Sequence, residues 1–490
     1  MKKIFLSAII LFILSPVFAQ LDNNKIAQQL AGRAVGTTPF IDDLRELCDQ
    51  IGGRPTGSPA CERAVEWAAA KFRVAGVDNV SLEPFSVPNL WLPQSAEASC
   101  LSPESFSIRL AATPYSPSTP QTIETKLVNA GNGSVEAFER LGTAARGAIA
   151  IVSSHEMKSL DDLFLEYLQN KPIQQAAEKA GVSALLLQST RSRGLLYRHP
   201  VSLNGTIAPI PTAIISREHA ARLIRLLDKG EVRLRLTLAN KISGAYQSRN
   251  VVAEIRGREK PAEIVLLGAH LDSWDLGTGA QDNGVNVALV IDVARAFKQL
   301  GIVPRRTIRF VLFTGEEQGM WGSAGYVQRH AAELDNHIAA VIFDIGSGRT
   351  MGFFLNGRAE LHKPIDEALG SVVGLGAINH TIDGVDGTDN FDFLLSGVPN
   401  LVANQEATPY LPDYHAESDV FEMVDIREAK ANTAIASVLI WGLAENPVRP
   451  AKRQSRDEIE KLLKETKLDE QMKAFGQWDD WISGKRGVNR

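Results

Sequence analysis

Several short polar clusters in this sequence follow apolar runs that are typical of buried strands. Imidazole and carboxylate groups are the nitrogen and oxygen ligands of hydrolytic metal sites, and a further carboxylate there can act as a general base. The sequence has no CxxC motif, so a zinc site built from thiolates is not expected. In chain order, the clusters contain His270 and Asp272, then Asp282, then Glu316 and Glu317, then Asp344, and finally His415.

The spacing within these clusters indicates what each could do. His270 and Asp272 are two residues apart, so at a strand end their side chains point the same way. Asp282 precedes a helical pattern, where it could cap the helix or bridge two metals. Glu316 and Glu317 are adjacent and face different ways, so one can bind metal while the other acts as a general base.

Alternating strands and helices must position these clusters. Continuous apolar strands between helices predict an α/β fold with a mixed, mostly parallel sheet flanked by helices. Such sheets bind ligands at the carboxyl ends of their strands, which is where the clusters fall. The expected strands include 251–255, 264–267, 306–313 and 339–344, and the expected helices lie near 284–299, 321–332 and 426–443.

The 490 residues are enough for two or three domains. We expect a discontinuous catalytic domain made from residues 20–119 and 246–446. Residues 120–245 contain no cluster of His, Asp and Glu, and they resemble a separate small α/β domain inserted into the larger one. Residues 447–490 are expected to form a polar C-terminal helical tail, which has a capping-box pattern at 455–458.

Residues 1–19 have the pattern of a secretory signal peptide. Lys2 and Lys3 precede the apolar run 4–14, and Val17-Phe18-Ala19 is a small-x-small cleavage site. The run is too short to span a bilayer. We therefore expect an exported protein, periplasmic or secreted, without a stable membrane anchor after signal cleavage.

Composition excludes some classes of partner. The 52 Lys and Arg residues against 57 Asp and Glu residues give a formal charge of −5, which argues against a basic protein that binds nucleic acid. Signal cleavage would remove two lysines and leave −7. In an oxidising compartment one pair among Cys48, Cys61 and Cys100 could form a disulfide and leave one free thiol.

In combination, the motifs GAHLDSWDLGTGAQDNG, FTGEEQGMWGS, FDIG, GTDNFDF and YHAESD resemble those of the di-zinc exopeptidases of metallopeptidase family 28. The resemblance covers about residues 38–110 and 246–445, and the inserted segment is similar to a protease-associated domain. It implies a zinc-exopeptidase fold of the phosphorylase/hydrolase-like kind, two Zn²⁺ ions per subunit and dipeptide or short-peptide substrates. Relatives often dimerise, so a homodimer is compatible with the resemblance, which leaves the oligomeric state open.

The resemblance also implies a role for each candidate residue. His270 and Asp344 would hold one zinc, Glu317 and His415 the other, and Asp282 would bridge them. Glu316 would be the general base, with Asp272 behind the metals and Asp419 near His415 in supporting positions. Thr388, Asp389, Tyr414 and Arg349 are the candidates for substrate binding, Tyr414 for an oxyanion and Arg349 for a terminal carboxylate.

Two activities remain open at this point: a dipeptidase of the carboxypeptidase type, and a broader aminopeptidase that releases N-terminal residues. A non-catalytic receptor on the same scaffold would have lost metal ligands, and none is missing. A serine hydrolase is disfavoured because no GxSxG motif follows a suitable strand. A calcium loop of Asp383, Asp386 and Asp389 lacks the required D-x-D-x-D-G spacing.

Overall fold

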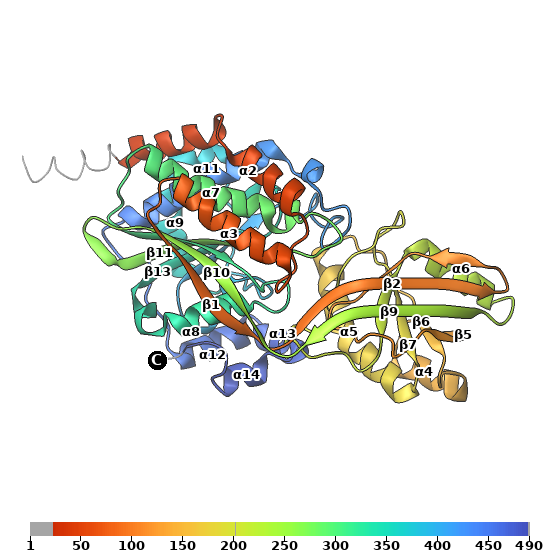
Figure 1. Cartoon of the computed structure of the whole chain (residues 1–490). Coiled ribbons are helices and arrows are strands. Elements are labelled where there is room, and N and C mark those ends of the chain that lie inside the picture. Colours follow the sequence, from red (N-terminus) through yellow and green to blue (C-terminus); the bar gives the residue numbers. More distant parts are fainter. Residues whose placement is uncertain (1–22, 201, 489–490) are drawn as a thin grey trace, which may run out of the picture.

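Two β-sheets covered by helices make up the part of the chain that the structure describes, residues 23–200 and 202–488 (Figure 1). This computed structural model confirms the predicted α/β class, with mixed sheets flanked by helices. The predicted signal peptide, residues 1–19, lies outside the described residues. Within the described ranges, no helix has both the length and the apolar character needed to cross a membrane.

The first sheet has seven strands, and its four central strands β12, β11, β13 and β15 are parallel. Strands β10 and β1 extend one side antiparallel, and β14 pairs antiparallel on the other. The sheet is therefore parallel at its centre and antiparallel toward both edges. Its strand order is β1 (Asn79–Val87), β10 (Tyr246–Ile255), β12 (Arg306–Phe313), β11 (Lys260–His270), β13 (His337–Ile342), β15 (Asn400–Gln405) and β14 (Thr350–Phe354).

Helices bury both faces of this sheet, as the alternation of side chains along each strand requires. Leu267 of β11 packs into the core shared with α7 and α11, whereas Leu266 packs into the opposite core beside α8 and α10. Figure 1 shows α2, α3, α7 and α11 together over one face. The helices are α2 (Phe40–Glu46), α3 (Pro59–Val74), α7 (Val285–Gln299), α8 (Trp321–Arg329), α9 (His362–Leu369), α10 (Asn390–Leu395) and α11 (Ile426–Glu445).

The second sheet has eight strands and belongs to the inserted domain. Its order is β3 (Phe106–Ile108), β2 (Leu90–Ser102), β9 (Arg233–Ser243), β5 (Ile123–Asn129), β6 (Ile149–Val152), β7 (Ala184–Gln188), β8 (Thr212–Ile215) and β4 (Leu110–Ala112). Helices α4 (Val135–Leu141), α5 (Leu160–Ala180) and α6 (Arg217–Leu227) accompany it. Strands β2, β3 and β4 precede residue 120, so this sheet begins earlier than the sequence-based boundary. The pairing of β2 with β9 joins residues far apart in sequence, which no local pattern reveals.

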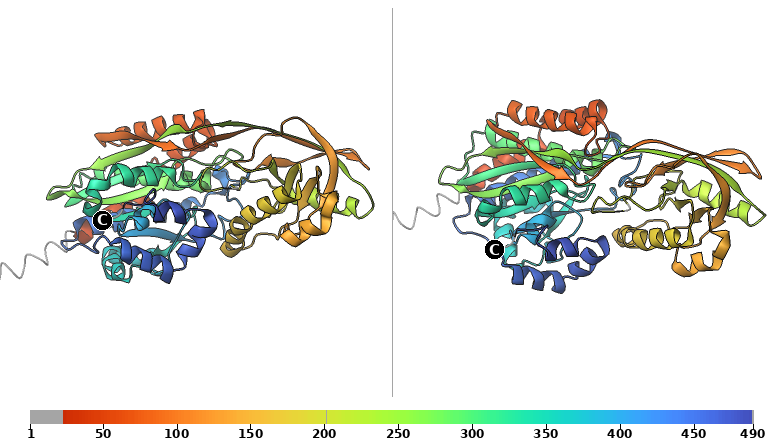
Figure 2. Two further views of the ribbon diagram at one scale, coloured as in Figure 1. Left: turned by 90° about the horizontal axis from the view of Figure 1, so that it is seen from below. Right: turned by 60° about the horizontal axis from the view of Figure 1, so that its bottom comes forward.

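A two-stranded ribbon connects the two sheets. Strands β1 and β10 pair in the first sheet, and their neighbours along the chain, β2 and β9, pair in the second. Val87 lies opposite Tyr246, and Leu90 lies opposite Ser243, so the two crossings run side by side. Figures 1 and 2 show this long ribbon passing from one domain into the other.

The C-terminal segment packs onto the first domain as three helices, α12 (Arg456–Glu465), α13 (Leu468–Phe475) and α14 (Trp478–Ile482). The capping box at Ser455 and Glu458 is confirmed at the start of α12. Leu463 and Met472 share a buried cluster with Phe391 and Leu395 of the α10 region. The apolar residues of this otherwise polar segment complete the core of the first domain.

The cysteines do not form the disulfide considered from the sequence. Cys48, Cys61 and Cys100 are all free and buried. Cys48 lies in the core of the first domain and Cys100 in that of the inserted domain, where each packs as a small apolar side chain.

The buried Arg54 fastens the loop after residue 51 to the loops that follow β11. Its guanidinium donates to the backbone carbonyls of Leu271, Thr278 and Gly279, the last two at 2.8 and 2.9 Å. A Cβ on the preceding Gly53 would lie 2.6 Å from the Cα of Asp275, so the loops meet at backbone distance. Arg54 therefore stabilises the segments on both sides of Asp272.

We expect Arg54→Met to lower the free energy of unfolding by about 3 kcal/mol, because three buried carbonyls would lose a charged donor. Arg45→Met is the matched control, since Arg45 is exposed, pairs with exposed Asp42 and otherwise lies over the ring of Phe421. The control should lose less than about 1 kcal/mol. Urea unfolding followed by tryptophan fluorescence measures both. Equal losses would contradict the structural role of Arg54.

Candidate metal centre

The carboxyl ends of the four parallel strands bring the predicted ligands together. His270 is the last residue of β11, Glu317 lies in the turn after β12, and Asp344 follows β13. His415 lies in the loop after β15, and Asp282 lies just before α7. Parallel strands end at the same edge of a sheet, so residues far apart in sequence converge there.

These residues form two groups that share one carboxylate. In the first, Nε2 of His270 lies 3.1 Å from Oδ1 of Asp282 and 2.9 Å from Oδ1 of Asp344. In the second, Nε2 of His415 lies 3.4 Å from Oδ2 of Asp282 and 2.7 Å from Oε2 of Glu317. Within each group the potential ligand atoms lie within 4.8 Å of one another. Asp282 thus presents one oxygen to each group.

The donor set fits two metal ions. Neither oxygen of Glu317, nor Oδ2 of Asp282, accepts a hydrogen bond from any described residue, although all three atoms are buried. Buried polar atoms are rarely left unpaired. These carboxylate oxygens face an imidazole nitrogen but lack hydrogen-bond geometry, which is the arrangement expected of ligands that share a cation. A ligand set of imidazole nitrogen and carboxylate oxygen suits zinc.

Both histidines are oriented through their second ring nitrogen. Nδ1 of His270 lies 3.0 Å from the carbonyl oxygen of Asp272, and Nδ1 of His415 lies 2.9 Å from the carbonyl oxygen of Arg198. Donation from Nδ1 leaves Nε2 as the free lone pair, which faces the carboxylates in each case. The ring orientations needed for metal binding therefore come from backbone contacts.

Other side chains hold the carboxylates in place. The carboxylate of Asp419 accepts from the backbone N–H groups of Gln281 at 2.6 Å and Asp282 at 3.1 Å. Asn283 donates from Nδ2 to Oδ1 of Asp344 at 2.9 Å. Sequence reasoning missed Asn283, although it lies directly after Asp282 in the motif.

Asp272 connects the first strand end to the glutamate pair. Its Oδ2 accepts from the hydroxyl of Thr56 at 2.6 Å, and its Oδ1 accepts from the backbone N–H of Glu316 at 3.4 Å. Asp272 is fully buried and does not line the cavity among the described residues. It is placed to position His270 and Glu316.

Burial and charge together perturb the titration of this site. Burial raises the pKa of Glu316 and of Glu317 well above the usual glutamate range, and neighbouring carboxylates raise both further. For His270, burial opposes protonation, but Asp344 and the other carboxylates outweigh it and raise the pKa. The carboxylates thus favour a positive charge beside them, which a metal dication would supply.

His415 behaves differently from His270. Burial lowers the pKa of His415 to about 4, so its ring is neutral near pH 7. The neutral imidazole is the form that binds a metal. Burial also raises the pKa of the supporting Asp419 to about 8.

The inserted domain clamps the loop that carries His415. The backbone N–H of Arg198 donates to the carbonyl of His415 at 3.0 Å, and that of Glu417 donates to the carbonyl of Leu196 at 3.0 Å. His415 has a φ of 58°, in the left-handed region that non-glycine residues rarely adopt. This strand-like pairing holds the strained residue, so the inserted domain supports the site although it contains no cluster of His, Asp and Glu.

Tyr414 also depends on the inserted domain. Its ring stacks on His415 with centroids 3.7 Å apart, and its hydroxyl lies 2.8 Å from that of Tyr167 in α5. Arg191 donates to the carbonyl of Tyr414 at 3.1 Å. Tyr414 thus lines the cavity, with its hydroxyl already bonded to Tyr167.

A cavity of about 340 Å³ opens onto the two ligand groups. Glu316, Thr388 and Tyr410 line it, together with α5 of the inserted domain and Phe475 at the end of α13. Sequence analysis did not single out Tyr410, because only the fold of the loop after β15 brings it to the cavity. Two domains and the C-terminal segment therefore build one site.

Two of the substrate-binding candidates do not line this cavity. Asp389 is fully buried and is absent from the described lining residues. Arg349 is exposed on the protein surface and pairs with Glu428 of α11 at 3.3 Å. The expectation that Arg349 binds a terminal carboxylate is wrong, because its side chain lies against α11 and not in the cavity.

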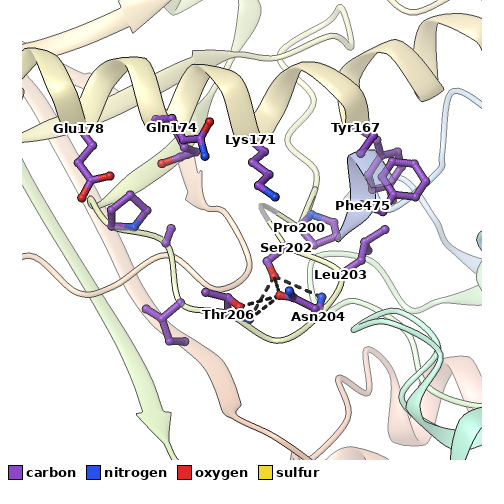
Figure 3. A pocket seen from close by; sticks show the side chains of 15 residues that line it. Tyr167, Lys171, Gln174, Glu178, Pro200, Ser202, Leu203, Asn204, Thr206 and Phe475 are labelled. Atoms are coloured by element: carbon purple, nitrogen blue, oxygen red, sulfur yellow. Dashed lines mark hydrogen bonds between the residues drawn. The ribbon is translucent and has the colours of Figure 1, made fainter. Parts of the chain in front are cut away.

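A second cavity of about 420 Å³ adjoins the first and shares Tyr167, Leu203 and Phe475 with it. Figure 3 shows Glu178, Gln174, Lys171 and Tyr167 descending from α5, with Phe475 beside Tyr167 at one end. The rings of Tyr167 and Phe475 lie 6.0 Å apart. This aromatic pair, one ring from the inserted domain and one from the C-terminal segment, lines both cavities.

Comparison with known proteins agrees with this geometry. The profile of Peptidase family M28 matches residues 250–440. Bovine (Bos taurus) carboxypeptidase Q is 28% identical over 408 residues, covering 82% of this chain and 84% of the bovine protein.

Two solved structures share the fold. The crystal structure of a peptidase M28 precursor from Shewanella amazonensis has a TM-score of 0.81 at 29% identity, covering 89% of this chain and 99% of that one. The zinc aminopeptidase BSAP from Bacillus subtilis has a TM-score of 0.66 at 20% identity, covering 84% and 97%. Because the family match, the homology to carboxypeptidase Q and the ligand geometry coincide, we conclude that this chain is a metallopeptidase whose residues 250–440 belong to peptidase family M28.

Proposed function

We propose that the protein is an exported exopeptidase that uses two zinc ions to hydrolyse dipeptides or short peptides with a free terminus. The observation that carries this proposal is the pair of ligand groups joined by Asp282, which opens onto a peptide-sized cavity beside Glu316. The likeness to carboxypeptidase Q and to BSAP, described as a zinc aminopeptidase, supports the same chemistry. The signal-peptide pattern of residues 1–19 supports export.

Each residue would contribute one function to the reaction. His270, Asp282 and Asp344 would hold one zinc, and Asp282, Glu317 and His415 the other. When bound, the ions would acidify a water molecule and polarise the scissile carbonyl. Glu316 lines the cavity without belonging to either ligand group, so its carboxylate is free to take the proton from water and deliver it to the leaving nitrogen.

The charge of the cavity favours recognition of an amino terminus. Apart from the proposed metal ligands, the described residues that line it include the acids Asp161, Glu316 and Asp386, and no lysine or arginine. The ammonium group of a substrate would be attracted to these acids, whereas its terminal carboxylate would find no lysine or arginine in this cavity to pair with. We therefore propose that the free N-terminus is read at the metal centre.

A dipeptidase of the carboxypeptidase type is the second candidate. The likeness to carboxypeptidase Q favours it, and Lys171 in the adjoining cavity offers a cation to a terminal carboxylate. A short peptide that passes the Tyr167 and Phe475 pair could present its N-terminus at the metals and its C-terminus to Lys171.

Chelation should abolish peptidase activity, and added Zn²⁺ should restore it, because the ligand carboxylates need compensating cations. The chelated protein should also unfold at a lower temperature, since ligands that bind only the folded state stabilise it. Activity and thermal unfolding measured in parallel check both statements. Full activity in protein shown by elemental analysis to be free of metal would refute the metal centre.

Glu316→Gln should keep both zinc ions but lose turnover by about 10²–10⁴-fold, the usual contribution of a general base. Glu317→Gln is the matched control: it should lose metal as well as activity, because Glu317 is placed as a ligand. Zinc content and kcat measured on both variants separate the two roles. Undiminished kcat in Glu316→Gln would refute the assignment.

A set of matched peptides identifies the terminus that is read. N-acetylation should abolish hydrolysis of a dipeptide, whereas C-amidation should reduce it by less than about five-fold if Lys171 makes only an exposed ion pair. Initial rates by chromatography measure the effect of each block. Loss on either block would favour the dipeptidase over the aminopeptidase.

A further inference from the structure

The catalytic cavity contains a carboxylate that neither the metal ligands nor the proton transfer uses. Asp386 lines the cavity and is only 4% exposed. Neither of its carboxylate oxygens has a partner with good hydrogen-bond geometry among the residues that the structure describes, although the backbone N–H of Gly387 lowers its pKa slightly. A buried carboxylate without partners is costly, so this position is suited to a ligand that supplies a cation.

The nearby cation is already engaged. Arg486, from the C-terminal segment, donates to both oxygens of Asp392 at 2.9 Å and to the carbonyl of Gly319 at 3.2 Å. Arg486 forms its ion pair with Asp392, so it stabilises the charge of Asp386 only from a distance, without a salt bridge between the two. Burial raises the pKa of Asp386 to about 7, and a bound cation would lower it again.

The surroundings of Asp386 fit the stem of a long basic side chain. Met320, Phe354 and Val385 line the same cavity and provide apolar surface. Lysine and arginine bury their aliphatic stems against such surface while their charged heads seek polar partners.

The place of Asp386 outside the ligand groups favours binding of a substrate side chain over binding of the substrate amino terminus. An α-ammonium lies one carbon from the scissile carbonyl, so it must stay beside the metal ligands. The ammonium of lysine lies at the end of a four-carbon stem. Asp386 belongs to neither ligand group, and its charged neighbours are Arg486 and Asp392 rather than the ligand carboxylates.

We propose that Asp386 is a specificity-determining residue that binds the ammonium or guanidinium of a basic substrate side chain. This inference rests on the proposed exopeptidase function and adds the substrate class, peptides whose lysine or arginine occupies the catalytic cavity. The aliphatic stem packs on Phe354 and Val385, and the charged head pairs with Asp386.

The test compares the full-length zinc enzyme with Asp386→Asn on the dipeptides Lys-Ala, Arg-Ala, Ala-Lys and Leu-Ala. The variant should lose about ten-fold in kcat/KM on lysine or arginine substrates, because a charge-assisted hydrogen bond disappears. It should change less than about two-fold on Leu-Ala. Asp383→Asn, at an exposed acid of the same loop, is the control and should leave all ratios unchanged.

Two further variants separate charge recognition from damage to the fold. Asp386→Glu should keep the preference for basic substrates, and Asp386→Lys should shift it toward Glu-Ala. An equal change on all substrates, or no change, would overturn the inference while leaving the peptidase function in place. A wild-type zinc enzyme that cleaves neither these dipeptides nor the same sequences extended by two alanines would instead refute the proposed function, and the inference with it.

Discussion

Buried negative charge is the constraint on which the rest of this site depends. Asp282, Glu316, Glu317 and Asp344 converge at one sheet edge. Burial and mutual repulsion raise the pKa of Glu316, Glu317 and Asp344 and favour their protonated forms unless cations compensate, whereas His270 and His415 lower the pKa of Asp282. Two dications would supply that charge. The surrounding hydrogen bonds serve the same end: Asn283 holds Asp344, Asp419 holds the backbone of Asp282, and backbone carbonyls fix both histidines.

The site is also assembled across domain boundaries. All the proposed metal ligands lie in the first domain, yet the carbonyl that orients His415 belongs to Arg198 of the inserted domain. The ribbon of β1–β2 and β9–β10 fixes how the two sheets meet, and Tyr167 then reaches Tyr414 and Phe475. The orientation of His415 therefore depends on the docking of the inserted domain, and the shape of the cavity depends on the C-terminal helices.

Sequence reasoning succeeded where local pattern and chemistry coincide. The strand 306–313 and the helix that starts at 285 follow from continuous apolar runs, and the acids and histidines that end such runs converge in the structure. It failed where partners come from distant segments. Arg349 is adjacent to the correct strand end but pairs with Glu428 of α11, and β2 joins the second sheet only through its pairing with distant β9.

By itself, the sequence determined the α/β class, the clusters able to hold metal and the resemblance to family 28, because these follow from apolar periodicity and from residue types at short spacing. Only the tertiary structure decided which atoms face one another. It made Asp282 the shared carboxylate, Arg198 the support of His415, and Asp386 an unpaired acid in the cavity. Those roles depend on distances and burial between segments far apart in the chain, which local sequence does not encode.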